Sequence, residues 1–297
     1  MSSFVIWTLA IGFVLNTVLF TAAVVFLAKR LKRGRPPRGQ DKKLLRSPGE
    51  HLQQELAAFD EQLTEQWFMG IFVPVVILLI PLALLPLAKG HESLVAALAL
   101  GGFLVSFILR LLRVRNLCEK IRTSRLGLLG ERAVAAALEP LLAKGYAVFH
   151  DLPAQGSQKS FNLDHVVVGP SGLFVIETKA RRKIHQDTNG DDHIVKFDGQ
   201  SLHWPGGSDQ RDVQQAADNA GWLQQFVEKR LGLRVNVVPL LVIPGWYVDR
   251  IGAGTVRVVN EGEAERTVLG RPVLDEKTVD QIKRQLDTEC RTVSFDA

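Results

Sequence analysis

The sequence predicts three transmembrane α-helices followed by an α/β domain. Long uncharged runs occur only within the first 112 residues, and short apolar segments alternate with helix-like segments after residue 113. Charge divides the chain in the same way, because residues 1–130 contain 16 Lys and Arg against 8 Asp and Glu, whereas the remainder contains 20 against 23. We therefore assign residues 1–112 to a membrane region and residues 113–297 to a soluble domain.

Composition excludes two other classes of protein. An apolar content of 46% is too high for a disordered chain, and two cysteines are too few for a disulfide-stabilised secreted fold.

Three apolar runs are long enough to cross a hydrocarbon core. They cover residues 4–28, 67–88 and 94–112, and the last two are separated only by residues 89–93. The last two are therefore expected to form a helical hairpin. The alternative for the first run, a cleaved signal peptide, is disfavoured because no basic residues precede it and several follow it directly.

Lys and Arg gather after the first and the third span. The positive-inside rule then places the N-terminus outside, and residues 29–66 and the C-terminal domain in the cytoplasm. We expect an integral protein of the inner or plasma membrane whose C-terminal domain faces the cytoplasm. The loop at 29–66 ends in a helix-like stretch with Leu52, Leu56, Phe59 and Leu63 at helical spacing, which predicts a solvated or membrane-surface amphipathic connector.

Periodicity and turn residues predict the elements of the soluble domain. A helix is expected to open the domain at Glu131 and to end at the cap Gly145. Two apolar strands then flank the turn sequence Gly-Pro-Ser-Gly at 169–172 and form a hairpin. A weaker strand pair, a helix over about 212–231, two further strands and a final helix capped by Asp275 complete the domain.

The turn fixes the register of the hairpin. With residues 169–172 as the turn, Val168 lies opposite Leu173, and counting outward places Asp164 opposite Glu177. Opposed residues point to the same face of a sheet, and Lys179 does so too because it is two residues beyond Glu177. We therefore expect Asp164, Glu177 and Lys179 to form one cluster.

Two opposed carboxylates repel each other unless a cation lies between them. Oxygen ligands of this number suit Mg²⁺ or Mn²⁺, which bind one or two carboxylates together with waters and substrate phosphate. The alternative interpretation is an ion-pair cluster on a half-exposed sheet surface.

The residues around this cluster resemble the nuclease-related domain (NERD), a branch of the PD-(D/E)xK nuclease superfamily. The resemblance covers about residues 125–230 and is carried by Gly130-Glu131-Arg132-Ala133-Val134 and by the continuous stretch from Asn162 to Ala180, with its D-x12-E-T-K core. It implies a restriction-endonuclease-like α/β core, a mixed sheet flanked by helices. The resemblance also implies that Glu131, Asp164, Glu177 and Lys179 form a metal-dependent phosphodiesterase site in that core.

The resemblance is incomplete at a later helix, which in this family often begins near Asn-Pro-x-x-Gln. Here the corresponding stretch is Arg211-Asp212-Val213-Gln214-Gln215. Gln215 fits as an auxiliary residue of the site, whereas the Asn-Pro pair is missing.

Chemistry assigns a role to each residue. Asp164 and Glu177 are expected to hold the metal, Glu131 to be an outer ligand or to position water, and Lys179 to offset charge in the transition state. For Glu131 the simpler explanation stays open, since the macrodipole alone favours a Glu in the first turn of a helix.

A basic run, Arg181, Arg182 and Lys183, follows the strand that carries Glu177. It is a candidate phosphate contact, and an ordinary solvated charge run is the alternative.

The sequence therefore supports two alternative functions. The first is a membrane-anchored nuclease that uses Mg²⁺ or Mn²⁺ to hydrolyse phosphodiester bonds of nucleic acid, with DNA preferred over RNA as the partner. The second is an inactive, membrane-tethered module that binds nucleic acid or protein. The sequence fixes no oligomeric state.

Overall fold

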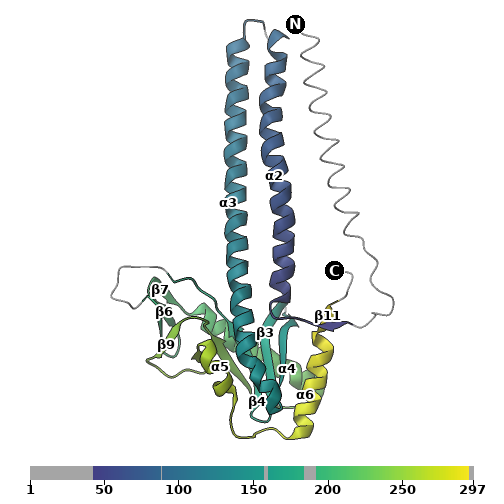
Figure 1. Ribbon diagram of the computed structural model, residues 1–297, viewed down its shortest axis with the longest axis vertical. Helices are drawn as coiled ribbons and strands as arrows, with labels where there is room; N and C mark the ends of the chain where they lie inside the picture. The colour runs from purple at the N-terminus through teal and green to yellow at the C-terminus, as the bar shows by residue number, and fades with distance from the viewer. Residues whose placement is uncertain (1–42, 88, 157–159, 184–191, 294–297) are drawn as a thin grey trace. The chain divides into compact units, whose positions relative to one another are not determined.

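A computed structural model describes residues 43–87, 89–156, 160–183 and 192–293 (Figure 1). The chain divides into two compact units. Within the described residues, the first contains Gln62–Asn116 and the second contains Lys43–Glu61 and Leu117–Val293.

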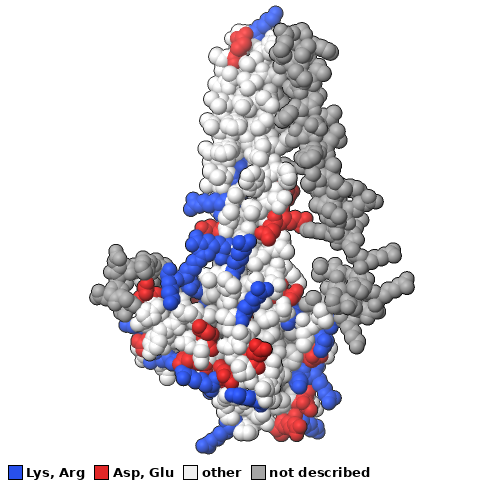
Figure 2. All heavy atoms as spheres, viewed as in Figure 1, with Lys and Arg blue, Asp and Glu red and all other residues white. Residues whose placement is uncertain are grey.

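The first unit is built from parts of two long helices, α2 (Glu50–Leu84) and α3 (Glu92–Leu138), with a short 3-10 helix, η1 (Leu85–Leu87), after α2. Arg110 Nη1 donates a hydrogen bond to Gln66 Oε1 at 3.2 Å, which ties the two helices together. Figure 2 shows uncharged atoms over most of these helices and basic side chains gathered where the apolar stretch ends, as expected from Arg110, Arg113 and Arg115.

Both helices are long and apolar enough to cross a membrane. Together with η1 they cover the run expected at 67–88 as far as Leu87 and the run expected at 94–112. Large apolar side chains such as Leu98 (67% exposed) are open to the surroundings. The third expected span, residues 4–28, lies outside the described residues, so the described part of the chain contains two such helices instead of three.

Two features of these helices differ from the boundaries that composition suggested. The helix-like end of the connector expected at 29–66 is continuous with the following apolar helix, since α2 runs unbroken from Glu50 and tolerates Pro74 and Pro81. Similarly, no helix begins at Glu131; that residue lies near the end of α3, which starts at Glu92. No helix-breaking residue separates the polar from the apolar part of either helix, so composition changes while the backbone continues.

The second unit is organised around a mixed five-stranded sheet with the order β10-β8-β4-β3-β2. The three strands β2, β3 and β4 form an antiparallel meander, whereas β8 is parallel to β4 and β10 is parallel to β8. The bounds are β2 (Ala147–Gln155), β3 (Ser160–Gly169), β4 (Gly172–Thr178), β8 (Val237–Val242) and β10 (Arg257–Val259). A two-stranded sheet pairs β1 (Leu44–Leu45) with β11 (Arg291–Val293).

Helices cover both faces of this sheet (Figure 1). On one face, Leu223 of α4 (Arg211–Leu231) and Leu286 of α6 (Glu276–Cys290) belong to the core. On the other face, Val134 of α3 and Val268 of α5 (Glu261–Val268) pack on the sheet with the 3-10 helix η2 (Glu139–Lys144). Because both faces are covered, every residue of β4 is buried. Mixed sheets flanked by helices are consistent with the nuclease-like core that the resemblance implied.

A smaller four-stranded sheet with the order β7-β6-β5-β9 packs against the first turns of α4. Its strands are β5 (Ile194–Phe197), β6 (Leu202–Trp204), β7 (Gly207–Asp209) and β9 (Tyr247–Arg250). Its core joins Val195 and Phe197 to Val213 and Ala216 of α4. The β5–β6 pair and the N-cap Asp275 were predicted and are confirmed, whereas β7, β9 and α5 were not foreseen.

The close approach of α3 to the end of β4 predicts the effect of substituting Gly130. A Cβ at Gly130 would lie 2.6 Å from Ala180 Cβ, so Gly130→Ala should destabilise the fold by about 1–3 kcal/mol through overpacking. Gly221→Ala is the matched control, since nothing lies within 4 Å of a Cβ there and Ala is the better helix former by about 1 kcal/mol. Thermal unfolding of the full chain in detergent should show opposite shifts of Tm for the two variants.

Candidate functional site

The hairpin of β3 and β4 has the register that the turn predicts. Val168 pairs with Leu173 and His165 pairs with Ile176, so the next position outward sets Asp164 opposite Glu177. Glu177 also pairs with Leu241 of β8, which puts it inside the sheet and not on its edge.

The two opposed carboxyl groups are buried and held by hydrogen bonds. Asp164 is 9% exposed, and its Oδ2 accepts the backbone N–H of Thr178 at 2.7 Å. Glu177 is 3% exposed, and its Oε1 lies 2.8 Å from Lys179 Nζ. A surface ion-pair cluster, the alternative that the sequence left open, does not describe side chains buried this deeply.

Helix α3 brings Glu131 to the same end of the sheet. Its side chain is 5% exposed, and its Oε2 is a buried oxygen without a hydrogen-bond partner among the described residues. Gly49 packs against it in a left-handed conformation with φ of 70°, and a Cβ there would lie 3.4 Å from that oxygen and 2.4 Å from Leu128 Cδ1. A buried carboxylate oxygen without a partner is costly, which singles out this atom for a ligand.

Helix α4 contributes a row of polar side chains to the cluster. Lys179 Nζ donates to Gln215 Oε1 at 3.1 Å and lies 3.9 Å from Asp212 Oδ1. Asn219 Nδ2 donates to Glu177 Oε2 at 2.8 Å. Gln215 is therefore placed beside Lys179, and the spacing of 212, 215 and 219 along one helix face is the signal that would have indicated Asp212 and Asn219.

Burial and mutual repulsion change the protonation of the cluster. Burial raises the pKa of Glu131 to about 7, although His51 opposes this shift. Burial and the charge of Glu177 raise the pKa of Asp164, and burial raises the pKa of Glu177 despite the neighbouring ammonium. Burial lowers the pKa of Lys179, but the carboxylates of Glu177, Asp212 and Asp164 together outweigh burial and the net shift is upward. These shifts show that the carboxylates form one electrostatic unit.

A further buried carboxylate, Asp151, was also missed by sequence reasoning. It lies on β2 at the position opposite Asp164 of β3, as the residue pairs on either side of it show. Its side chain is fully buried, and its backbone has φ of 50°. Its Oδ2 accepts Arg46 Nε at 2.7 Å and the backbone N–H of His51 at 2.9 Å, and its Oδ1 is paired with His51 Nδ1. Both partners precede Asp151 by about a hundred residues, so no local pattern signals this contact.

The basic run after β4 is not uniformly open to a ligand. Arg181 Nη2 contacts Asp209 at 2.9 Å and Asp212 at 3.1 Å. Arg182 Nη2 donates to the carbonyl of Arg122 at 3.3 Å, and Lys183 is exposed. Arg181 is therefore an internal ion-pairing residue, while Lys183 remains open to a phosphate.

The donor set fits a hard divalent cation held by few protein ligands. Among the described residues, no three His, Cys, Asp or Glu side chains are placed to surround one ion. Mg²⁺ does not require that, because it binds through one or two carboxylates and keeps several waters. The unpartnered Oε2 of Glu131 and the carboxyl groups of Asp164 and Glu177 are donors of this kind.

Residues 126–244 match the family described as the nuclease-related domain (NERD). The matched region contains Glu131, Asp164, Glu177, Lys179 and Gln215, and it excludes Arg46 and His51. No curated protein and no solved structure matches the chain. The region is thus similar to a nuclease-related domain and carries the buried cluster inside it.

The raised pKa of Glu131 predicts how stability depends on pH. The folded state holds a proton on this group up to about pH 7, whereas the ordinary pKa is 4.5, so stability should fall as pH rises through that window. In the Glu131→Gln variant, the free energy of unfolding should fall by up to about 3 kcal/mol less than in the wild type over the same pH range. The readout is the slope of Tm against pH for the full chain in detergent, and Glu139→Gln, an exposed change on η2, should leave the slope as it is. Equal slopes for wild type and Glu131→Gln would contradict the assignment.

Proposed function

We propose that the protein is a membrane-anchored, metal-dependent nuclease that hydrolyses phosphodiester bonds, with DNA as its substrate. The observation that carries the proposal is the buried cluster of Glu131, Asp164 and Glu177 with one ammonium, Lys179, inside the region similar to a nuclease-related domain. Perturbed carboxylates gathered at one point are typical of a functional site.

In this proposal Asp164 and Glu177 would hold Mg²⁺ or Mn²⁺, and Glu131 would be an outer ligand or would position a water molecule, since no three such side chains among the described residues surround one ion. The bound cation would make a water molecule more acidic and neutralise charge on the phosphate. Lys179 is oriented by Glu177 and Gln215, so its ammonium points at a fixed place beside the carboxylates and stabilises the charge that develops on the phosphate oxygens. Asn219 holds Glu177 in the orientation that leaves its Oε1 toward Lys179.

The membrane part of the proposal rests on α2 and α3, which have the length and composition of spanning helices. Basic residues follow the apolar stretch of α3, which favours a cytoplasmic position for the nuclease-related domain. Residues 4–28 would supply the third span.

One observation favours the second candidate, an inactive binding module. Both oxygens of Glu177 already have partners, and the described residues form no group of three metal-ligating side chains. Removal of a carboxylate should abolish cleavage by an active enzyme, whereas in a binding module it should change only the affinity for a partner.

Asp164→Asn and Glu177→Gln should each lower Mg²⁺-dependent cleavage of DNA by more than about 100-fold, since they remove a negative metal ligand while keeping the shape. Lys179→Ala should lower kcat by about 100- to 1000-fold with little change in metal affinity. Asp280→Asn, on the exposed face of α6, is the control and should retain activity. Cleavage of plasmid and oligonucleotides by the full chain in detergent measures these effects. Absence of metal-dependent cleavage in the wild type, with carboxylate variants that change only partner affinity, would favour the binding module.

The proposed orientation predicts the behaviour of reporter fusions. A fluorescent protein fused after Ala297 should be bright, and alkaline phosphatase at the same position should be inactive, because the C-terminus would be cytoplasmic. The reverse pattern would show that the orientation is wrong.

A further inference from the structure

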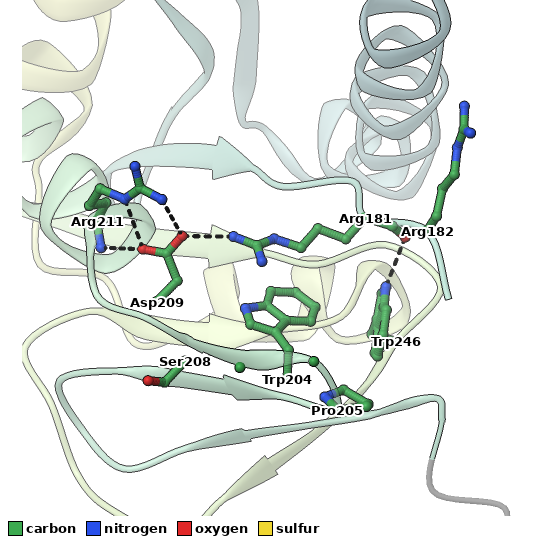
Figure 3. Close-up of a pocket in the computed structure, with 10 residues that line it drawn as sticks. Arg181, Arg182, Trp204, Pro205, Ser208, Asp209, Arg211 and Trp246 are labelled. Carbon is green, nitrogen blue, oxygen red and sulfur yellow. Dashed lines mark hydrogen bonds and ion pairs between the residues drawn. The ribbon is translucent and has the colours of Figure 1, made fainter. Parts of the chain in front are cut away.

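A cavity of about 270 Å³ lies beside the small sheet, where β6 turns into β7. It is lined by Arg181, Arg182, Trp204, Asp209, Arg211 and Trp246 together with the turn between the two strands (Figure 3). We call it the Trp204 pocket.

Arginine supplies the accessible charge of the Trp204 pocket. Arg181 is paired with both Asp209 and Asp212, whereas the side chain of Arg182 points away from the pocket (Figure 3). The side chain of Arg211 is 91% exposed, so its guanidinium remains accessible from solvent while it is held by Asp209. Arg211 is therefore the group of the pocket that suits an anionic ligand.

The pocket also offers aromatic surface. Trp204 and Trp246 form an edge-to-face pair with ring centroids 4.8 Å apart, and the Arg181 guanidinium lies 4.5 Å from the Trp204 ring. The indole nitrogen of Trp204 lies on the side of the ring nearer Asp209 (Figure 3), and it has no hydrogen-bond partner among the described residues. Trp246, in contrast, donates to the carbonyl of Arg181 at 3.1 Å. A ligand with a flat ring suits this lining.

The Trp204 pocket adjoins the carboxylate cluster through Asp212. One oxygen of Asp212 lies 3.1 Å from Arg181 Nη2, and the other lies 3.9 Å from Lys179 Nζ. Lys179 belongs to the cluster and Arg181 to the pocket, so the same carboxylate is shared by the two. A chain of nucleotides with one phosphodiester at the cluster would therefore extend a neighbouring nucleotide toward the pocket.

We propose that the Trp204 pocket holds an unpaired nucleotide next to the phosphodiester at the cluster, which makes single-stranded DNA the substrate class. This inference rests on the proposed nuclease function. A base in a duplex is stacked and paired on both sides, so only an unpaired base is free to enter a cavity lined by tryptophan and arginine. Arg211 contacts the phosphate of that nucleotide, and Trp204 contacts its base.

The test measures binding without cleavage. The full chain in detergent is titrated in EDTA against a fluorescent single-stranded oligonucleotide and against the same sequence as a blunt duplex, at several salt concentrations. The single strand should bind at least about 10-fold more tightly, and Trp204→Leu should weaken its binding about 5- to 100-fold, the range found when one stacked base is lost. Arg211→Ala should lower the slope of log K against log salt by about 0.7, because one phosphate contact is lost.

Arg234→Ala is the matched control for Arg211→Ala. Arg234 is 88% exposed and paired with Glu228, so its removal deletes an equally exposed, equally paired charge away from the pocket. Equal affinity for single strand and duplex, or equal effects of Arg211→Ala and Arg234→Ala, would overturn the proposal even if Trp204→Leu fails to fold. Pocket-dependent binding without any Mg²⁺-dependent cleavage would support the pocket and overturn the nuclease function, so the two failures are distinguishable.

Discussion

The electrostatic cost of placing carboxyl groups in the interior of the sheet explains most of the polar contacts around the site. Asp151, Asp164 and Glu177 occupy successive positions across β2, β3 and β4, and all three are buried. Buried charges are retained only when partners compensate them. Lys179 and Asn219 do so for Glu177, and Arg46 and His51 do so for Asp151 through residues distant in the sequence. Glu131 Oε2 has no such partner among the described residues, and burial raises the pKa of this carboxyl group to about 7.

The segment Lys43–Glu61 supplies the partners of one of these buried carboxyl groups, Asp151. Arg46 and His51 lie outside the region similar to the nuclease-related domain, yet they hold Asp151 in its left-handed conformation. Asp tolerates positive φ better than most residues, but the conformation persists only when its surroundings fix it. The compact domain therefore depends on a segment that precedes it by about seventy residues, and a fragment that begins at residue 113 would lack both of these partners.

Sequence reasoning predicted local features well and distant ones poorly. The turn at 169–172 was enough to fix the β3–β4 register, and Asp275 was enough to place the start of α6, because both signals are local. The burial and pairing of Asp151 could not be predicted because its partners come from another part of the chain. Sequence reasoning also missed that α2 and α3 each run unbroken through a polar and an apolar part. The reason is different: a change from polar to apolar composition suggests a boundary, but a helix ends only where caps or breakers end it.

The departure from the Asn-Pro-x-x-Gln pattern has a structural consequence at α4. Because the helix begins at Arg211, Asp212 falls in its first turn, where the macrodipole favours a carboxylate. From that position its two oxygens face Lys179 on one side and Arg181 on the other. Gln215 follows one turn later and orients Lys179. The missing Asn-Pro pair therefore leaves the auxiliary glutamine in place and adds a carboxylate that links the cluster to the Trp204 pocket, so one helix face sets the positions of both.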